Sequence, residues 1–362
     1  MVESKMALEI ETPPEAPDEI TQEEVKRRPP PTLGEIVLNQ LKTLRDYHRL
    51  VMKAGDVESV HKMRVTTRRL QASLDLLLMK DDEMGVRKLK KRLRRWRRWL
   101  STVRNYDVFL IIIDRQSSSR RPSQSRKFDL LKTLLEERRR LRMEKVRRRL
   151  EFIDIGAIAT SLGLTLDESE TGGEGGAQIA AEEAADTRLT GACFPGMDKK
   201  RITLRTAARL EQRQSEFLSL AAESHPTTDP LELHELRIAA KRVRYILEIV
   251  SEMGYGDATR GLNWLRVLQD KIGDWHDLES LEEEVIDIVC RRNFIKENLS
   301  EGSRILQEAA HLRKKKDALV AKLFPVNVPK NLTATSERLA RALRREAMRE
   351  GSQDTASGEP LV

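Results

Sequence analysis

Residues 60–78 read VHKMRVTTRRLQASLDLLL, and residues 233–251 read LHELRIAAKRVRYILEIVS. The two stretches align without a gap at a constant offset of 173 residues, so that His61 matches His234 and Arg64 matches Arg237. In each copy, apolar residues recur at helical spacing, which predicts an amphipathic helix. The repeat indicates that the chain contains two structurally related halves.

Each copy of the repeat also places its basic side chains on the face opposite its apolar stripe. At about 100° per residue, His61, Arg64 and Arg68 fall together on the first helix, and the leucines fall on the far side. The corresponding face of the second helix carries His234, Arg237, Lys241 and Arg244. Guanidinium groups bind phosphate oxygens in a bidentate manner, and lysine adds a point charge. The two rows therefore predict a binding site for a polyanion.

Periodic apolar residues on both sides of the two copies predict further helices and an all-α fold. The first helix begins near Thr32, with Glu35 in position to complete a capping box. The other helices of the first half are expected at about 58–79, 85–103 and 126–151. Those of the second half are expected at about 199–223, 231–253, 257–273 and 299–323, with one more between the last two. Because helices with short connections form bundles, we predict two tandem antiparallel four-helix bundles.

The composition divides the chain into five parts. We predict a disordered tail at 1–31, a first bundle at 32–155, a linker at 156–198, a second bundle at 199–324 and a polar tail at 325–362. The first tail is acidic and rich in proline, and the linker is acidic and rich in Gly and Ala. Such compositions are typical of segments that do not form a packed core.

Basic residues are concentrated in the first half. Residues 60–150 contain 29 Lys and Arg against 10 Asp and Glu, whereas the net charge of the whole chain is only +8. An excess of this kind repels itself in the compact state. A solvated face would explain a short run of charge, but over this length a polyanionic partner is the better explanation.

Further basic residues flank the two rows and are expected to add to the same site. In the helix at 85–103 they follow the apolar seam by one position, and in the helix at 126–151 they recur at similar spacing. Trp96 lies in the seam itself, so we predict that it is a core residue and not a platform for stacking bases. The additional candidate site residues are Arg69, Lys90, Arg94, Arg97, Arg104, Arg138, Arg142, Arg242 and Arg313.

Cysteine content and hydropathy predict a cytoplasmic protein. Cys193 and Cys290 are too few and too far apart for a disulfide framework or a metal site, which fits a reducing compartment. No apolar run approaches the ~20 residues of a membrane span. The acidic, proline-rich beginning of the chain does not have the pattern of a signal peptide. We therefore expect no membrane partner.

No motif points to catalysis, a cofactor or a metal. The chain has no glycine-rich phosphate loop and no nucleophile–base motif. Glu9 begins a Glu-x-Glu-x-Lys pattern, but Pro13 stands at the lysine position. Asp274, His276 and Asp277 lie close together, and without a second cluster we interpret them as a helix-end cap with a packing role. We therefore predict a binding protein that is not an enzyme.

The repeated segments resemble the CHAD family, the conserved histidine α-helical domain. Its pattern is an apolar residue and then His-x-x-Arg-apolar-x-x-(Arg/Lys), which VHKMRVTTRRL and LHELRIAAKRV match once per half. A second family element is similar to VRNYD at 103–107 and IGDWHD at 272–277. Asn105 departs from that element, where the family often has Asp, and Gln71 is uncharged where Arg244 is cationic. The resemblance extends over about residues 33–324.

The resemblance implies that the two bundles face each other around a basic channel that binds inorganic polyphosphate, often at polyphosphate granules. By matching positions, the channel residues would be His61, Arg64, Arg68, His234, Arg237 and Lys241. The alternatives are a sequence-independent nucleic-acid-binding protein, an accessory module of polyphosphate-metabolising enzymes and a purely scaffolding protein. A bound polyanion favours charged imidazole, so affinity is expected to rise as the pH falls through ~6.5.

Overall fold

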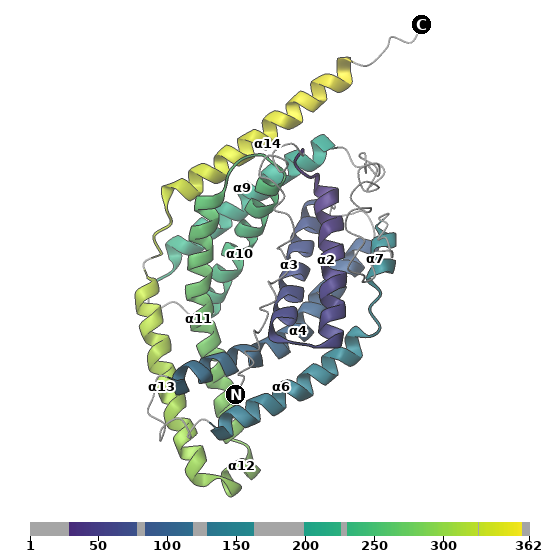
Figure 1. Ribbon diagram of the computed structural model, residues 1–362. Coiled ribbons are helices and arrows are strands. Elements are labelled where there is room, and N and C mark those ends of the chain that lie inside the picture. The colour runs from purple at the N-terminus through teal and green to yellow at the C-terminus, as the bar shows by residue number, and fades with distance from the viewer. Residues whose placement is uncertain are drawn as a thin grey trace, which may run out of the picture. The chain divides into compact units, whose positions relative to one another are not determined.

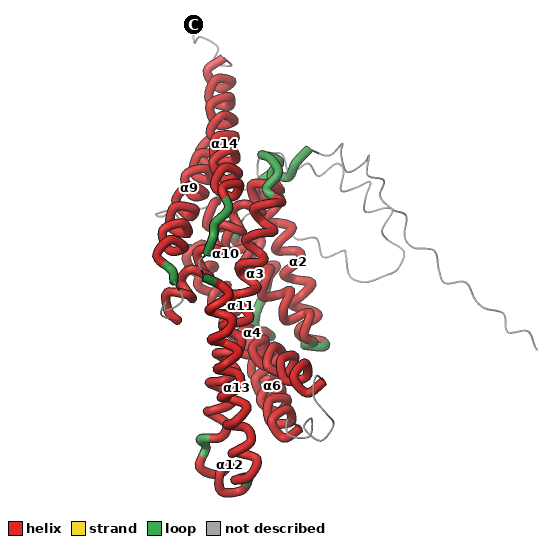
Figure 2. Tube along the Cα trace, turned by 90° about the vertical axis from the view of Figure 1, so that its left-hand side faces the viewer, coloured by secondary structure: helices red, strands yellow, loops and turns green. Residues whose placement is uncertain are grey.

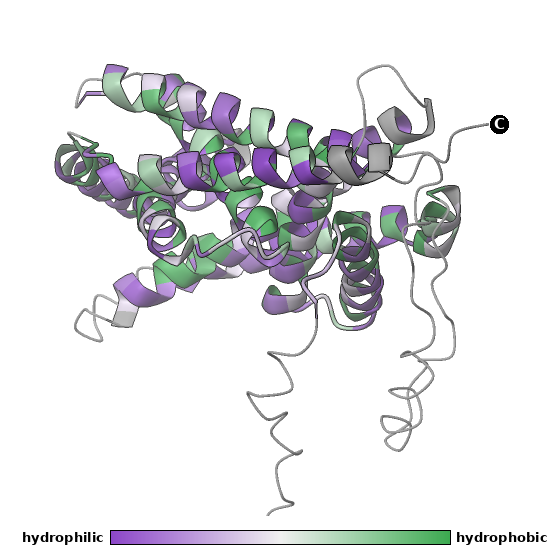
Figure 3. Cartoon of the chain, turned by 90° about the horizontal axis from the view of Figure 1, so that it is seen from above, coloured by the Kyte–Doolittle hydropathy of each residue, from purple (hydrophilic) through white to green (hydrophobic). Residues whose placement is uncertain are grey.

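The computed structural model describes residues 29–77, 84–118, 129–162, 199–225, 230–324 and 326–356. Within these ranges all regular elements are helices (Figure 2), so the predicted all-α class is confirmed. Residues 1–28 of the predicted tail and residues 163–198 of the predicted linker lie outside the described ranges. Hydrophilic residues alternate with hydrophobic ones along the helices (Figure 3), as amphipathic packing requires.

The first half begins at the predicted capping box. The Thr32 side chain accepts a hydrogen bond from the backbone N–H of Glu35, and the Glu35 carboxylate accepts one from the backbone N–H of Thr32. Gly55 has a φ of 63°, which allows the chain to turn sharply between the first two helices. The helices of this half are α2 (Leu33–Lys53), α3 (Val57–Leu77), α4 (Met84–Ser118), α6 (Asp129–Leu150) and the short α7 (Ile155–Ser161).

The second half repeats this order of helices. The two copies of the repeated segment form α3 and α10, and these two helices pack against each other. The helices of this half are α9 (Lys199–Glu223), α10 (Pro230–Glu252), α11 (Thr259–Val289), α12 (Arg292–Glu297), α13 (Leu299–Leu323) and α14 (Lys330–Ala356). In the described part of the chain, no helix is long and apolar enough to cross a membrane.

Two helices are longer than the sequence predicted. The helix expected to end at 103 continues to Ser118, and the one expected to end at 273 continues to Val289. The apolar stripe continues through both extensions, with Phe109 and Ile113 buried in α4 and Leu281 and Val285 buried in α11. The additional helix that the sequence predicted between 273 and 299 is therefore mostly the continuation of α11. Among the described residues of this segment, α12 forms a short separate helix.

These extensions join the two halves, which differs from the expected pair of separate bundles. The second part of α4, the first part of α6, the second part of α11 and α13 share one apolar core (Figure 1). A larger core contains α2, α3, α9, α10 and α14, with the remaining parts of α4, α6 and α11. Residues 31–362 accordingly form one compact unit.

The end of the chain also differs from the prediction of a polar tail. Lys330–Ala356 forms α14, which packs along α9 (Figure 1). Its buried residues include Leu332, Leu339 and Leu343. A side chain at Gly261 of α11 would place its Cβ 2.9 Å from Cδ1 of Leu332, so glycine allows the close approach there. The many arginines of this helix lower its average hydropathy and concealed its apolar stripe.

Candidate functional site

Basic side chains from three helices meet where α3 packs against α10. Their charges lie close enough together to lower the pKa values of Arg64 and Lys241, and each member is half-buried. We name this set the cation cluster: Arg64, Arg68, Arg97, Arg104, Arg237 and Lys241. Within the described residues, none of the six makes an ion pair with a carboxylate. The structure therefore brings together cations from both halves, as the repeat predicted.

Arg64 lies at the centre of the cation cluster. Burial and then the charges of Arg68, Arg104, Arg237 and Arg97 lower its pKa to about 9. Its guanidinium donates to Oγ of Ser101, and Ser101 in turn donates to the Arg97 carbonyl at 2.6 Å. A neutral hydroxyl satisfies a donor but does not neutralise a charge. The positive charge of Arg64 is thus available to an anion.

The second half contributes Arg237 and Lys241, one turn apart on α10. Burial lowers the pKa of Arg237, whose Nε is buried and has no hydrogen-bond partner among the described residues. Burial and then Arg237, Arg68, Arg64 and Arg244 lower the pKa of Lys241 to about 6. Mutual repulsion of this kind disfavours the ligand-free state, and an anion would relieve it.

The two repeated histidines lie at the edges of the cation cluster. His61 is half-buried, and burial followed by the charge of Arg104 lowers its pKa. His234 is exposed, and its ring centroid lies 5.7 Å from that of His276 on α11. Burial and then Arg237 lower the pKa of His276 to about 4.

His276 was not among the predicted site residues, and its interpretation as part of a helix-end cap is wrong. Asp274, His276 and Asp277 lie in the interior of α11, because the helix continues to Val289. Asp277 faces Arg237, while burial raises the pKa of its carboxyl group. The sequence signal for His276 was the motif GDWHD. The repeat had already marked a face with one histidine in each half, His61 and His234, and this motif adds another histidine.

Equivalent aspartates in the two halves have different partners. Asp107 of α4 is buried and accepts a hydrogen bond of 2.5 Å from Nε of Arg139. Arg139 also donates to the Gly55 carbonyl at 3.0 Å, which ties α6 to the turn between α2 and α3. Among the described residues, Asp277 makes no ion pair of this kind and lies beside the cation cluster instead.

Three predicted site residues on the repeated helices are paired with glutamates. Arg69 lies 3.6 Å from Glu248 and Arg244 lies 3.5 Å from the same residue. Arg242 lies 3.9 Å from Glu216. Arg69 and Arg242 are exposed, because each is one position beyond the row that faces the partner helix. The structure therefore places them outside the cation cluster.

The flanking candidates outside the cation cluster are exposed or neutralised. Lys90 pairs with Asp75 at 2.6 Å, and Arg94 is exposed and donates to the Lys90 carbonyl at 3.3 Å. Arg313 pairs with Glu282, and Arg142 is exposed beside Tyr106.

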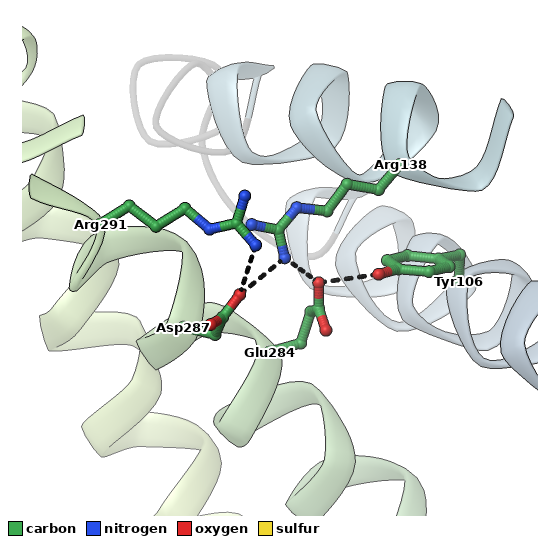
Figure 4. A network of polar contacts seen from close by, with 5 residues as sticks. All are labelled: Tyr106, Arg138, Glu284, Asp287 and Arg291. Atoms are coloured by element: carbon green, nitrogen blue, oxygen red, sulfur yellow. Dashed lines mark hydrogen bonds and ion pairs between the residues drawn. The ribbon is translucent and has the colours of Figure 1, made fainter. Parts of the chain in front are cut away.

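Arg138 belongs to a separate polar network between the halves. It binds Glu284 and Asp287 of α11, and Tyr106 donates to Glu284 at 2.9 Å (Figure 4). Arg291 also binds Asp287, at 3.0 Å. Since every cation here has an acidic partner, this network serves to join helices.

Comparison with known proteins identifies the family. The chain is similar to the crystal structure of the CHAD domain from the plant Ricinus communis, at 20% identity and a TM-score of 0.55, over 83% of this chain and 94% of that one. It is also similar to PptA from Streptomyces chartreusis, at 16% identity and a TM-score of 0.50, over 88% of this chain and 98% of that one. No curated protein matches. The CHAD domain model matches residues 35–285, and the chain belongs to that family.

Proposed function

We propose that this protein binds inorganic polyphosphate at the cation cluster and does not catalyse a reaction on it. The observation that carries the proposal is the meeting of six cations from both halves without a paired carboxylate. Basic side chains at an ordinary surface pair with acids or are solvated, as Arg69 and Arg242 are. A half-buried set of like charges destabilises the folded protein unless something of opposite sign compensates it.

A thin, densely charged chain fits this environment better than a nucleic acid does. Polyphosphate carries about one negative charge per phosphate, with no base or sugar to accommodate. Tyr245, which lies beside Arg97 and Arg237, is buried and offers no exposed ring on which a base could stack. A half-buried site between packed helices also excludes a duplex.

Competition between polyanions tests the proposal. Labelled long-chain polyphosphate should bind with a steep salt dependence, and single-stranded or duplex DNA at equal charge concentration should compete poorly. Equal or better competition by DNA would favour the nucleic-acid function. Incubation of the complex should release no phosphate, and steady release would contradict the non-catalytic part of the proposal. In cells we expect the protein to be cytoplasmic and to associate with polyphosphate granules.

The histidines provide a second test of the same site. A bound polyanion should raise the lowered pKa values of His61 and His234, so binding takes up protons and affinity rises as the pH falls. Affinity should therefore increase from about pH 7.5 to about pH 5.5. The control variant His311→Gln, on the exposed face of α13, should show the same dependence of affinity on pH as the wild type. If the affinity of the wild type does not change with pH, His61 and His234 are not part of the site.

A further inference from the structure

Lys241 occupies an unusual position for a lysine. It faces Arg64 and Arg68 across the contact between α3 and α10, and Arg237 lies one turn before it on its own helix. The other charged or titratable groups around it are His234 and Arg244 of α10 and His276 and Asp277 of α11. Lys241 makes no ion pair among the described residues, and its side chain remains partly accessible to solvent.

These surroundings favour the neutral amine, which is the nucleophilic form of lysine. Burial and then the neighbouring cations lower the pKa of Lys241 to about 6. An ordinary lysine has a pKa near ~10.4, so only about one in a thousand carries a free amine at neutral pH. A lysine that is desolvated next to other cations is a recognised way of obtaining a reactive amine.

The same surroundings attract a phosphate group to within reach of this amine. Nε of Arg237 is buried and has no partner among the described residues. Gly273 of α11 packs beside the same guanidinium, since a Cβ there would be in van der Waals contact, 3.6 Å from Nη2 of Arg237. Arg64 adds a second guanidinium that is not neutralised. The charges of both arginines act on Lys241, so an anion bound between them would lie beside the Lys241 side chain.

We propose that Lys241 is a modification site that small acyl phosphates, such as acetyl phosphate, acylate while the cation cluster holds their phosphate. The neutral Nζ attacks the acyl carbon and forms a C–N bond, and the C–O bond to phosphate breaks. The amine proton passes to the departing phosphate, so the products are an N-acyl lysine and hydrogen phosphate. Atoms and charges balance, and no further reactant is needed.

Acylation would regulate the proposed function, and this consequence rests on that function. The amide of an acylated lysine cannot take up a proton, so the cation cluster loses a group that would otherwise become charged when polyphosphate binds. Bound polyphosphate would in turn cover Lys241 and neutralise its neighbours, which returns the amine to its unreactive, protonated form. Acylation and polyphosphate binding should therefore oppose each other.

The experiment is a time course of the full chain with acetyl phosphate at about pH 7.5, followed by peptide mass spectrometry. Lys241 should be acetylated about tenfold faster than the exposed Lys62 and Lys91, because its larger neutral fraction outweighs the lower nucleophilicity of a weakly basic amine. Arg237→Met, and separately Arg64→Met, should slow only Lys241. An acetyl donor without phosphate, such as an N-hydroxysuccinimide ester, should show a smaller preference for Lys241.

Added inorganic phosphate should slow the acetylation of Lys241, because it occupies the same arginines. Three outcomes would overturn the proposal: Lys241 is acetylated no faster than Lys62, the donor without phosphate shows the same preference for Lys241, or inorganic phosphate does not slow the acetylation of Lys241. Lys241→Arg cannot be acylated, so it should lose the fast modification while the other lysines are acetylated at the same rates as in the wild type. Binding of polyphosphate is measured separately on unmodified protein. Binding without acylation contradicts this inference alone, and acylation without binding contradicts the proposed function alone.

Discussion

Arg64 and Arg69 are five residues apart on one helix, yet their environments are opposite. Arg64 is half-buried among other cations, whereas Arg69 is exposed and lies 3.6 Å from Glu248. The second copy repeats this contrast, with Arg237 in the cation cluster and Arg242 exposed near Glu216. Burial and the absence of an acidic partner therefore distinguish binding candidates from ordinary surface arginines.

This contrast provides matched variants for binding. Arg64→Ala with Arg237→Ala should weaken polyphosphate binding by about 100-fold or more, since hydrogen bonds to charged groups contribute ~1.5–3 kcal/mol each. Arg69→Ala with Arg242→Ala removes the same two charges from the same helices and should change affinity by only about threefold. Fluorescence anisotropy measures affinity, and circular dichroism checks that helical content is kept. Equal losses in the two double variants would show that only net charge matters.

Lys241 should also make the stability of the ligand-free protein depend on pH. Its pKa is about 6 in the folded state, whereas an unfolded lysine titrates near ~10.4. Between these values the unfolded state binds more protons, so stability increases as the pH rises and is lost as the pH falls toward 6. The contribution to the free energy of unfolding is at most about 1.4 kcal/mol per pH unit.

Urea unfolding at several pH values between about 6.5 and 9 tests this. Lys241→Met should flatten the rise and stabilise the ligand-free protein, because it relieves repulsion. Lys316→Met, which removes a lysine that lies 3.2 Å from Glu282, should keep the wild-type slope. Parallel profiles for wild type and Lys241→Met would mean that Lys241 remains charged in the folded protein.

At the scale of the elements, α14 completes the second half. In the first half, α6 runs from the shared core at Leu131 and Leu135 to the larger core at Val146 and Leu150. In the second half, α13 reaches the larger core at its last residue, Leu323, and α14 supplies further contacts there through Leu332, Leu339 and Leu343. In the second half, α13 and α14 together therefore contact both cores, as α6 alone does in the first half.

Leu339 of α14 is fully buried, and its replacement tests this packing. Leu339→Ala should lower the free energy of unfolding by about 2–5 kcal/mol, as large-to-small changes in a core do. Val267→Ala on α11, where the valine is 54% exposed, should change it by less than about 0.5 kcal/mol. Urea unfolding followed by circular dichroism measures both. An unchanged stability in Leu339→Ala would indicate that α14 is not docked.

At the scale of the whole molecule, the halves are joined at two places with different chemistry. Around the cation cluster they meet through like charges that favour separation. At the shared core they meet through apolar contacts and through the ion pairs of Arg138 with Glu284 and Asp287 (Figure 4). Apolar contacts in both cores hold the halves together, while the cation cluster remains available to a ligand.

A double-mutant cycle on Arg138→Met and Glu284→Gln measures the strength of this link. Both side chains are largely buried, so we expect a coupling energy of about 1–3 kcal/mol. The exposed pair of Arg140 and Glu144 on α6 should give about 0.5 kcal/mol or less. Polyphosphate affinity should be the same in the Arg138 variant as in the wild type. A lower polyphosphate affinity of Arg138→Met would show that Arg138 contributes to the binding site.

Local patterns in the sequence were sufficient to predict several helices and the equivalence of the two halves. Apolar periodicity predicted α3 and α10, the repeat predicted their equivalence, and Thr32 with Glu35 predicted the start of α2. The phase of Arg64 and Arg237 opposite the apolar stripe correctly indicated that they share a cluster. These properties depend on residues within a few turns of one another, so the sequence alone determines them.

Only the tertiary structure decided which cations are neutralised and where the helices end. Arg69 meets Glu248, Arg138 meets Glu284 and Arg313 meets Glu282 through contacts that no local spacing reveals. The shared core similarly extends α4 and α11 beyond their predicted ends by burying side chains from the other half. Charge pairing and burial depend on neighbours that are distant along the chain, and these set both the pKa of a side chain and the stability of a helix.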